Sequence, residues 1–308
     1  MQEGDAARQE LQQQRRKTTA RRDLSRHENF DEVSPEVGIL DESGFDKALS
    51  EDADAALTML ADLTGATDRA LAQLARRLAG RLALELTRTG PAKGRGVRRL
   101  RTDRADRAEG DIDIDASLDA LVGARAQRRP VALEELVVRT WGRPDVALCL
   151  LVDRSGSMGG DRLAAAALAA AACAWRCGED YSVLAFSDKI LVVKGQNERR
   201  RPDEVMDDLF SLRGFGPTDL SLAFRVARDQ LATARATRRI VVVLSDCRPT
   251  AGGDPAIAAG ALEELAVLAP ADDAAEAQEL AARVGARCVL LDGAADIPAA
   301  FVRLMEAS

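Results

Sequence analysis

The stretch Val146-Ala-Leu-Cys-Leu-Leu-Val-Asp153-Arg-Ser155-Gly-Ser157-Met158 decides the fold. Its first seven residues are apolar without interruption, which is typical of a strand buried on both faces of a sheet. The polar residues that follow, together with Gly159-Gly160, indicate a tight loop before a helix-like stretch over 161–177. In an open α/β sheet, ligands bind outside the carboxyl ends of the strands. The Asp-x-Ser-x-Ser side chains therefore occupy the place where such a sheet holds a ligand.

Two further segments supply side chains of the same kind. The glycine-rich loop Gly214–Leu220 brings the hydroxyl of Thr218 to the start of another helix. The second apolar strand, Ile240–Asp246, ends in a carboxylate. Hydroxyl and carboxylate oxygens are the ligands that Mg²⁺ prefers. Each motif alone is explained as well by a helix cap or a solvated strand end, but the three in order favour a metal site.

The order and spacing of these residues resemble the metal-ion-dependent adhesion site of the von Willebrand factor A (vWA) family, across roughly 136–308. The resemblance implies that Ser155, Ser157 and Thr218 bind the metal directly. It implies that Asp153 and Asp246 act largely through water or hydrogen bonds. The expected ion is Mg²⁺, with Mn²⁺ as the alternative. An Asp or Glu of a partner protein is then expected to complete the coordination sphere, so that metal and partner bind with positive coupling.

Strands and helices alternate through this region, which predicts an α/β fold with a doubly wound, mostly parallel sheet flanked by helices. A short hairpin around Ser187-Asp188 is expected to add an antiparallel edge. The segment Leu136-Val-Val-Arg-Thr-Trp141 is expected to form an edge strand before the strand that carries Asp153. We therefore assign residues 136–308 to a vWA domain.

The remaining part of the chain divides into three segments by composition. Residues 1–44 show little periodic apolar pattern and are predicted to be mostly disordered, with the single histidine, His27, exposed to solvent. Residues 45–90 carry leucines at helical spacing and predict a helical hairpin, which serves either as a small bundle on the main domain or as a docking surface. Residues 91–135 are predicted to be a charged linker.

The linker opens with a basic run, which has eight basic and two acidic residues between Arg88 and Arg107. Such a run fits nucleic acid, a nucleotide phosphate or an acidic protein surface, or it is a solvated linker that the acids of Asp111–Asp115 neutralise. No aromatic residues are interleaved with it, which argues against nucleic acid. The chain contains no G-x-x-x-x-G-K-[ST] motif, so we expect no ATPase activity of its own.

Composition and charge restrict the setting in which the protein works. The formal net charge of −7 argues against general binding to nucleic acids or membranes. The first residues contain no apolar targeting segment, and the longest apolar run, over 163–175, is too short to span a bilayer. The five cysteines are odd in number and show no C-x-x-C spacing, which indicates reduced thiols. We therefore expect a cytoplasmic protein.

Within the vWA family, the pattern is most similar to the intracellular proteins that work with MoxR-type and magnesium-chelatase-type AAA+ ATPases. The segments Glu135–Arg139 and Ser245–Thr250 carry this resemblance. Cys247 stands where the group usually has glycine, and Pro217 interrupts the usual Gly-Thr, but neither change removes a ligand oxygen. The resemblance implies an adaptor that couples a separate AAA+ ATPase to a client protein or to metal insertion.

The alternative is an enzyme component, either a metal-chelatase subunit or a metal-assisted hydrolase. Chelatase subunits of the similar group usually carry an AAA+-like region before the vWA domain, and residues 1–135 are too short for one. A hydrolase needs a general base near the metal, and the only histidine lies in the predicted tail. Asp219 or Asp246 is available in principle, whereas Cys247 lacks a histidine partner. We therefore predict no catalytic residues and rank the adaptor first.

Overall fold

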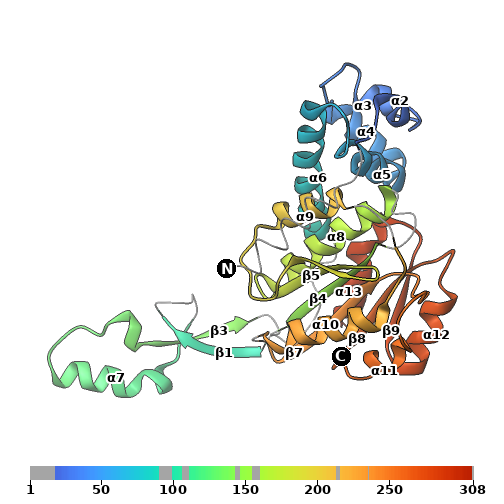
Figure 1. Ribbon diagram of the computed structural model, residues 1–308. Helices are drawn as coiled ribbons and strands as arrows, with labels where there is room; N and C mark the ends of the chain where they lie inside the picture. The colour runs from blue at the N-terminus through green and yellow to red at the C-terminus, as the bar shows by residue number, and fades with distance from the viewer. Residues whose placement is uncertain are drawn as a thin grey trace. The chain divides into compact units, whose positions relative to one another are not determined.

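The computed structural model describes residues 18–89, 99–105, 111–142, 146–154, 160–212, 216–234 and 236–306. The chain divides into two compact units. The main unit consists of Met1–Ala92 together with Val146–Ser308, and the inserted unit consists of Lys93–Asp145. Figure 1 shows the elements of both units along the chain.

The main unit is built on a six-stranded sheet in the order β6-β5-β4-β7-β8-β9. Its strands are β4 (Val146–Asp153), β5 (Tyr181–Phe186), β6 (Ile190–Lys194), β7 (Arg238–Leu244), β8 (Leu265–Pro270) and β9 (Arg287–Leu291). Neighbouring strands pair in parallel, except that β6 runs antiparallel to β5 at the edge. The predicted mostly parallel sheet with an antiparallel hairpin at its edge is therefore confirmed.

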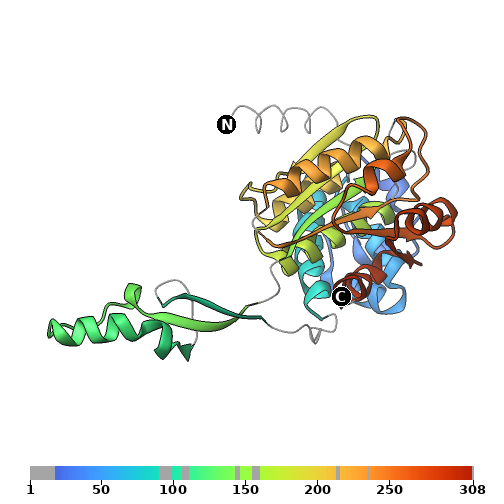
Figure 2. The ribbon, with the colours of Figure 1, turned by 90° about the horizontal axis from the view of Figure 1, so that it is seen from below.

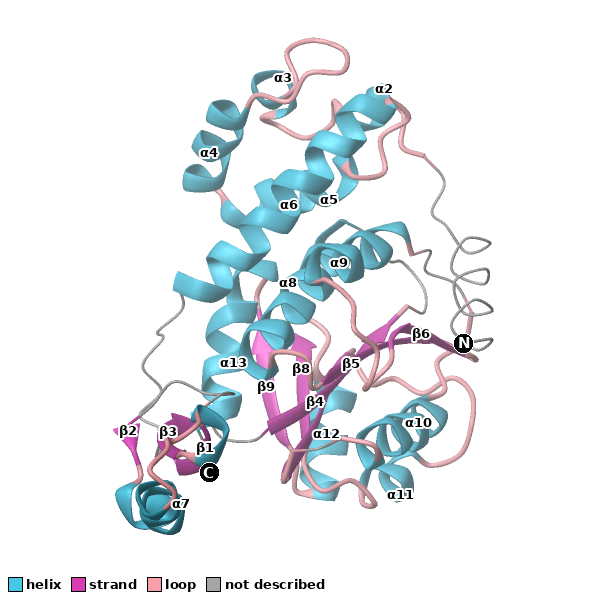
Figure 3. Ribbon diagram, turned by 90° about the vertical axis from the view of Figure 1, so that its left-hand side faces the viewer, coloured by secondary structure: helices cyan, strands magenta, loops and turns pink. Residues whose placement is uncertain are grey.

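Helices cover both faces of this sheet (Figure 3). One face carries α8 (Gly160–Cys177), α9 (Pro202–Ser211) and α13 (Ile297–Glu306), and the other carries α10 (Leu220–Ala232), α11 (Pro255–Ala259) and α12 (Ala275–Val284). Successive side chains of a strand point to opposite faces. Leu148 and Leu150 of β4 accordingly join the core with α8, whereas Cys149 and Leu151 join the core with α10. Coverage of both faces explains why β4 is apolar along its length.

The amino-terminal helices belong to the same unit. They are α2 (Arg21–Leu24), α3 (Phe30–Val33), α4 (Glu42–Glu51), α5 (Ala53–Leu63) and α6 (Arg69–Thr89). The predicted helical hairpin is present as α5 and α6, and Asp68 caps α6 by accepting hydrogen bonds from the amides of Ala70 and Leu71. Leu57 and Leu60 of α5 are buried in the core that also contains α8. The hairpin therefore packs on the main domain, as the simpler of the two interpretations expected.

The prediction of disorder up to residue 44 is wrong for residues 18–44. Leu24, Phe30 and Val33 of the short helices α2 and α3 are buried. Helices of four residues are too short to show an apolar period in the sequence, and they are held by tertiary packing instead. Residues 1–17 lie outside the described residues.

The inserted unit has its own sheet, in the order β1-β3-β2, with all pairs antiparallel. The elements of the unit are β1 (Arg99–Arg104), β2 (Asp111–Ile112), α7 (Ile114–Ala126), the 3₁₀ helix η1 (Leu133–Glu135) and β3 (Val137–Gly142). Figure 2 shows α7 beside these strands. The predicted charged linker is therefore folded in its described parts, and β3 is the centre of this separate sheet rather than an edge of the main one. An alternating pattern predicts a strand but does not identify the strand's partners.

Candidate metal centre

The pairing of β4 with β7 brings two of the predicted site residues to one edge of the sheet. The strands are parallel neighbours, with Val152 opposite Leu244. Asp153 is the last residue of β4, and Ser245-Asp246 directly follows β7. The hydroxyl of Ser245 donates a hydrogen bond of 2.6 Å to Oδ2 of Asp153, and both side chains are buried, each only 6% exposed. Ser245 therefore helps to orient the carboxylate of Asp153.

Thr218 lies in the loop before α10, and the loop after β7 holds its backbone. The amide of Thr218 donates to Oγ1 of Thr250 at 2.7 Å. Its carbonyl accepts from the amides of Thr250 and Ala251, each at 3.1 Å. Thr218 itself is 2% exposed. These hydrogen bonds fasten the loop that carries Thr218 to the loop that begins with Asp246.

The loop after β5 ties the same edge together from the other side. The amide of Arg154 donates to the carbonyl of Phe186 at 3.0 Å, and the amide of Asp219 donates to the carbonyl of Ser187 at 2.9 Å. Because every one of these bonds involves the backbone, they fix the paths of the loops at the ends of β4, β5 and β7. The edge is therefore organised by the protein's own contacts.

Three of the five predicted ligands, Asp153, Thr218 and Asp246, thus lie in segments that the structure brings to the same end of the sheet. Ser155 and Ser157 lie outside the described residues, and the ligand role of all five stays a prediction. The chemistry of the three fits a hard cation, because carboxylate and hydroxyl oxygens are what Mg²⁺ or Mn²⁺ binds. Among the described residues, no cluster of three or more His, Cys, Asp or Glu side chains offers a competing metal site.

Asp153 and Asp246 both line a cavity of about 720 Å³. The cavity lies at the carboxyl ends of β4, β7, β8 and β9, where Leu244, Pro270 and Leu291 form part of its wall. The lining also includes His27, Asp54 and Thr58 of α5, and Arg162 of α8. Residues from the amino-terminal part of the chain therefore share one cavity with the strand ends that carry the predicted site.

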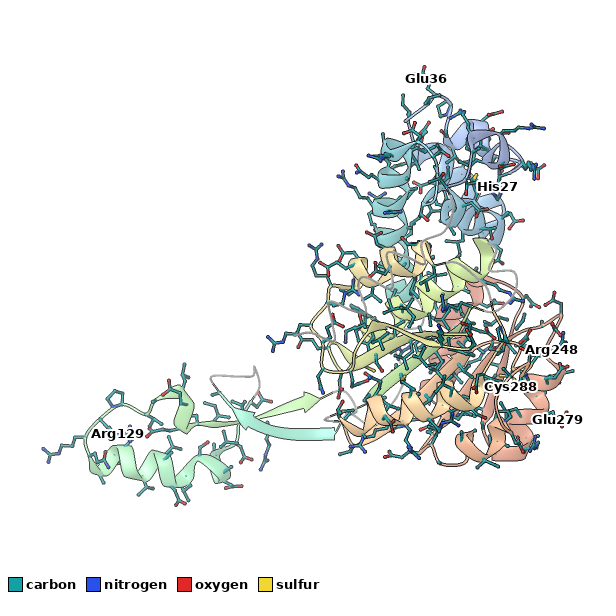
Figure 4. All side chains as sticks on the ribbon, viewed as in Figure 1. His27, Glu36, Arg129, Arg248, Glu279 and Cys288 are labelled. Atoms are coloured by element: carbon teal, nitrogen blue, oxygen red, sulfur yellow. The ribbon has the colours of Figure 1, made fainter. Side chains whose placement is uncertain are left out.

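His27 is not the solvated side chain that the sequence suggested. Its Nε2 lies 3.2 Å from Oδ2 of Asp62, and the two side chains are 24% and 18% exposed. Figure 4 shows His27 among the amino-terminal helices. The pair joins a loop to α5, so His27 has a structural partner. Sequence reasoning missed it because Asp62 lies 35 residues further along the chain.

Asp54 connects the same helix to the far edge of the sheet. Its Oδ1 accepts a hydrogen bond of 2.9 Å from the amide of Ala295, in the 3₁₀ helix η2 (Ala294–Asp296). A Cβ atom at Gly293 would lie 2.2 Å from the Asp54 carboxyl group, so the close approach requires glycine at that position. The wall that α5 contributes to the cavity is therefore anchored directly beside it.

Of the three side chains considered for catalysis, Asp219 and Cys247 are engaged otherwise, whereas Asp246 lines the cavity. The Asp219 carboxylate caps α10 by accepting a hydrogen bond of 2.8 Å from the amide of Leu222. Cys247 is buried, and burial, with the nearby charges of Asp246 and Asp153, raises the pKa of its thiol well above its usual range. A thiol that stays protonated at neutral pH is a poor nucleophile.

Cys247 also has a backbone φ of 57°, in the left-handed region that glycine adopts most easily. Next to it, the amide of Arg248 donates to Oδ1 of Asp246 at 3.0 Å. The Arg248 guanidinium forms ion pairs with Asp273 and Glu276 near the start of α12. Arg248 is labelled in Figure 4. The loop after β7 is thus held at both ends.

Sequence reasoning did not identify Ser245, Thr250 or Arg154 as parts of the site. Ser245 becomes recognisable once β4 and β7 are paired in parallel, because it then stands beside Asp153. Thr250 acts through loop geometry that no local pattern encodes. Arg154, at a variable position of the Asp-x-Ser-x-Ser motif, is buried with Nη2 donating to Oγ of Ser187 at 3.4 Å. Arg154 thus adds a side-chain link between the end of β4 and the loop after β5.

A doubly wound parallel sheet with this edge on its central strands defines a vWA-type α/β domain. The chain belongs to the family described as "VWA domain containing CoxE-like protein", whose sequence pattern matches residues 83–272, more than half of the chain. The matched range contains the whole inserted unit. A search of curated proteins gave no match.

Solved structures with a similar fold share little sequence with this chain. Proximal thread matrix protein 1 from the mussel byssus is 11% identical, with a TM-score of 0.45, over 53% of this chain and 47% of its own. A manganese-loaded TRAP protein from Plasmodium vivax is 16% identical, with a TM-score of 0.42, over 52% and 74%. A von Willebrand factor type A protein from Catenulispora acidiphila is 15% identical, with a TM-score of 0.42, over 55% and 43%. The chain thus spans about half the length of the mussel protein.

In the part of the chain that the structure describes, no helix has both the length and the apolar character that a membrane crossing requires.

Proposed function

We propose that this protein is a metal-dependent protein-interaction module that serves as an adaptor for a separate MoxR-type AAA+ ATPase. The observation that carries the proposal is the arrangement of Asp153, Thr218 and Asp246 in three segments bound together at one end of the sheet. A divalent ion, Mg²⁺ in our proposal, would supply there a positive centre that accepts a carboxylate oxygen from an Asp or Glu of the partner.

The protein's own residues prepare this edge before a partner arrives. Ser245 holds the Asp153 carboxylate by a hydrogen bond between two buried groups. Thr250 holds the backbone on both sides of Thr218. Such preorganisation lowers the entropic cost of binding, because the loops are already ordered when the partner binds. It supports a docking role for the edge.

Three observations support a binding role over an enzymatic one. Asp219 is occupied as a helix cap, the Cys247 thiol has a raised pKa, and His27 is paired with Asp62. A metal-assisted hydrolase needs a group that is placed and protonated correctly for proton transfer. The alternatives of a hydrolase or a chelatase subunit therefore have less support than the adaptor.

The ATPase partner rests on the sequence resemblance of the segments Glu135–Arg139 and Ser245–Thr250. Either the ATPase or its client would supply the acidic side chain. A cytoplasmic location is part of the proposal and is supported by the five cysteines, all of which are free thiols.

Metal binding is tested first, without a partner. We expect Mn²⁺ titrated into the whole protein to give an electron paramagnetic resonance signal of bound ion, with Mg²⁺ competing for the same site. Thr218→Ala and Asp246→Ala should weaken binding at least about tenfold, since each removes an oxygen from the site. Thr233→Ala is the matched control, because Thr233 lies at the far end of α10 and its hydroxyl donates a hydrogen bond to the carbonyl of Gln230 within the same helix end.

The docking role is tested next, by measuring the affinity for the co-purified ATPase in Mg²⁺ and in EDTA. We expect binding in Mg²⁺ that EDTA abolishes and that Thr218→Ala weakens without lowering the melting temperature by more than about 4 °C. Equal affinity in EDTA would contradict the docking role. ATP or phosphoester hydrolysis by the purified chain alone, lost in Asp246→Ala, would favour the enzyme instead.

A further inference from the structure

The inserted unit carries an apolar stripe on the outside of α7. Ile114, Leu118 and Val122 are spaced four residues apart, so they lie on one face of the helix, and they are 66%, 52% and 60% exposed. Ile112 and Leu133 of the same unit are also exposed. Half of the large apolar side chains that are exposed in the described residues therefore belong to this one small unit. Such clustering marks an interaction surface more often than scattered single residues do.

The opposite side of α7 is attached to its sheet mainly through polar contacts. Asp113 caps the helix and forms an ion pair of 2.7 Å with Arg139 of β3. Oγ of Ser117 accepts a hydrogen bond of 2.9 Å from the amide of Val137. Among the unit's described side chains, the buried apolar ones are Ala124 and Val138. The described side chains of the unit therefore bury little apolar surface, and the stripe is a surface that gains from being covered.

Charges beside the stripe change sign along the helix. Asp115 and Asp119 directly follow Ile114 and Leu118 in sequence, so they form a row along one side of the stripe. Arg125 lies one turn beyond Val122, at the other end of the helix. Among the described residues, none of these three charged side chains forms an ion pair within the chain.

The apolar and charged side chains of α7 are arranged so that two antiparallel copies of the helix match each other. Leu118 and Val122 lie at equal distances on either side of Ala120, and so do Asp115 and Arg125. When two copies of the helix are aligned antiparallel about Ala120, Leu118 comes level with the second copy's Val122. Asp115 then comes level with the second copy's Arg125. In a two-fold symmetric dimer each contact therefore occurs twice, and most homodimers have this symmetry.

We propose that α7 is a dimerisation helix, which packs antiparallel against α7 of a second copy of this chain. The apolar stripe forms the centre of the contact, and two symmetric Asp115–Arg125 pairs set its direction. A single pair of short helices buries less surface than the about 1,200 to 2,000 Å² of a stable interface. The dimer is therefore weak and forms at micromolar concentration.

The experiment is sedimentation velocity on the full chain over roughly 1 to 200 μM protein, the range in which weak interfaces dissociate. The buffer contains EDTA, so that association through the candidate metal centre does not contribute. We expect a monomer–dimer equilibrium that Leu118→Asp weakens at least about tenfold. The matched control is Ile257→Asp, because Ile257 is an apolar residue of α11 in the main unit that is 78% exposed. It should leave the dissociation constant unchanged.

Charge reversal tests the direction of the helices. Asp115→Arg alone and Arg125→Asp alone each place like charges together twice, so each should weaken the dimer roughly tenfold. The double variant Asp115→Arg with Arg125→Asp restores opposite charges and should recover the wild-type dissociation constant within about threefold. Both residues are exposed, so neither variant should impair folding.

A monomer at every concentration would overturn the proposal. So would a dimer that Leu118→Asp leaves intact, which would place the interface elsewhere. If Leu118→Asp leaves sedimentation unchanged but makes residues 93–145 sensitive to protease, the stripe is covered within one chain and the proposal is also wrong. Failure of the double charge reversal to restore the dimer would exclude the antiparallel alignment.

Discussion

The strands of the main unit are rich in branched apolar residues and helices cover their sheet on two faces, whereas β1 of the inserted unit, Arg99-Leu-Arg-Thr-Asp-Arg104, is mostly charged. In β4 each successive side chain reaches one of two cores. In the inserted unit the buried polar residues Asp113 and Ser117 hold α7 to β3, while the stripe of α7 is exposed. A strand pattern thus specifies the local element, whereas the layers packed on it determine whether the unit is stable alone.

The largest expected difference between the units is the loss of stability when a buried side chain is shortened. Leu150→Ala in β4 should lower the free energy of unfolding of the main unit by about 3 to 5 kcal/mol, because it leaves a cavity in a fully packed core. Val138→Ala in β3 should leave that transition unchanged. Urea unfolding is followed through the fluorescence of Trp175, with Trp141→Phe as the background, since the chain has two tryptophans.

An equal effect of the two alanine substitutions on the Trp175 transition would show that the two units unfold as one. The comparison between a self-sufficient and a dependent unit would then fail. A separate, earlier loss of structure in the Val138→Ala variant, seen by hydrogen exchange at residues 111–142, would sharpen it.

A smaller effect is expected from two adjacent glycines in the loop beside the candidate metal centre. Gly252 has φ 83°, and a Cβ atom there would lie 2.3 Å from Oδ1 of Asp219. Gly252→Ala should therefore lower the free energy of unfolding by about 2 to 3 kcal/mol. Gly253→Ala is the control, because a Cβ atom there meets nothing within 4 Å. Urea unfolding measures both.

If Gly252→Ala matched Gly253→Ala in stability, the loop would be able to move away from Asp219, and the edge would be less organised than its hydrogen bonds indicate. Because the loop also carries Thr250, Mn²⁺ affinity measured on the same variants shows whether a shift of the loop reaches Thr218.

The smallest expected effect is a gain in the stability of α7 in the inserted unit. Gly123 lies inside α7, and a Cβ atom there meets nothing within 4 Å. Gly123→Ala should stabilise the helix by about 1 kcal/mol, because alanine loses less backbone entropy on folding than glycine. Slower amide exchange over 114–126 measures this gain. Unchanged amide protection would mean that helix propensity does not limit the stability of α7.

Much of the main sheet could be predicted because its strands are continuous apolar runs that end at polar residues, as in Val146–Asp153 and Ile240–Asp246. Their parallel pairing follows from the alternation of strands and helices, and it places Asp153 and Asp246 at one edge. This much requires only local pattern and the rules of chain connection.

The remaining features depend on contacts between distant residues. The burial of α2 and α3 and the pairing of His27 with Asp62 carry no local signal. The role of Ser245 appears only when β4 and β7 are in register, and that of Thr250 only when two loops meet. β3 was predicted as a strand but assigned to the wrong sheet, because a segment with strand-like residues is compatible with any neighbouring edge.

The position of the inserted unit has a consequence for synthesis on the ribosome. The apolar residues of α5 and α6 are buried in the core that also contains α8, yet α8 follows α6 only after the whole of Lys93–Asp145. At about 5 to 20 residues per second, the amino-terminal helices wait several seconds for the helix that covers them. During that interval their leucines are available to chaperones. Nascent chains of this protein should therefore bind chaperones most strongly before residue 177 has left the exit tunnel.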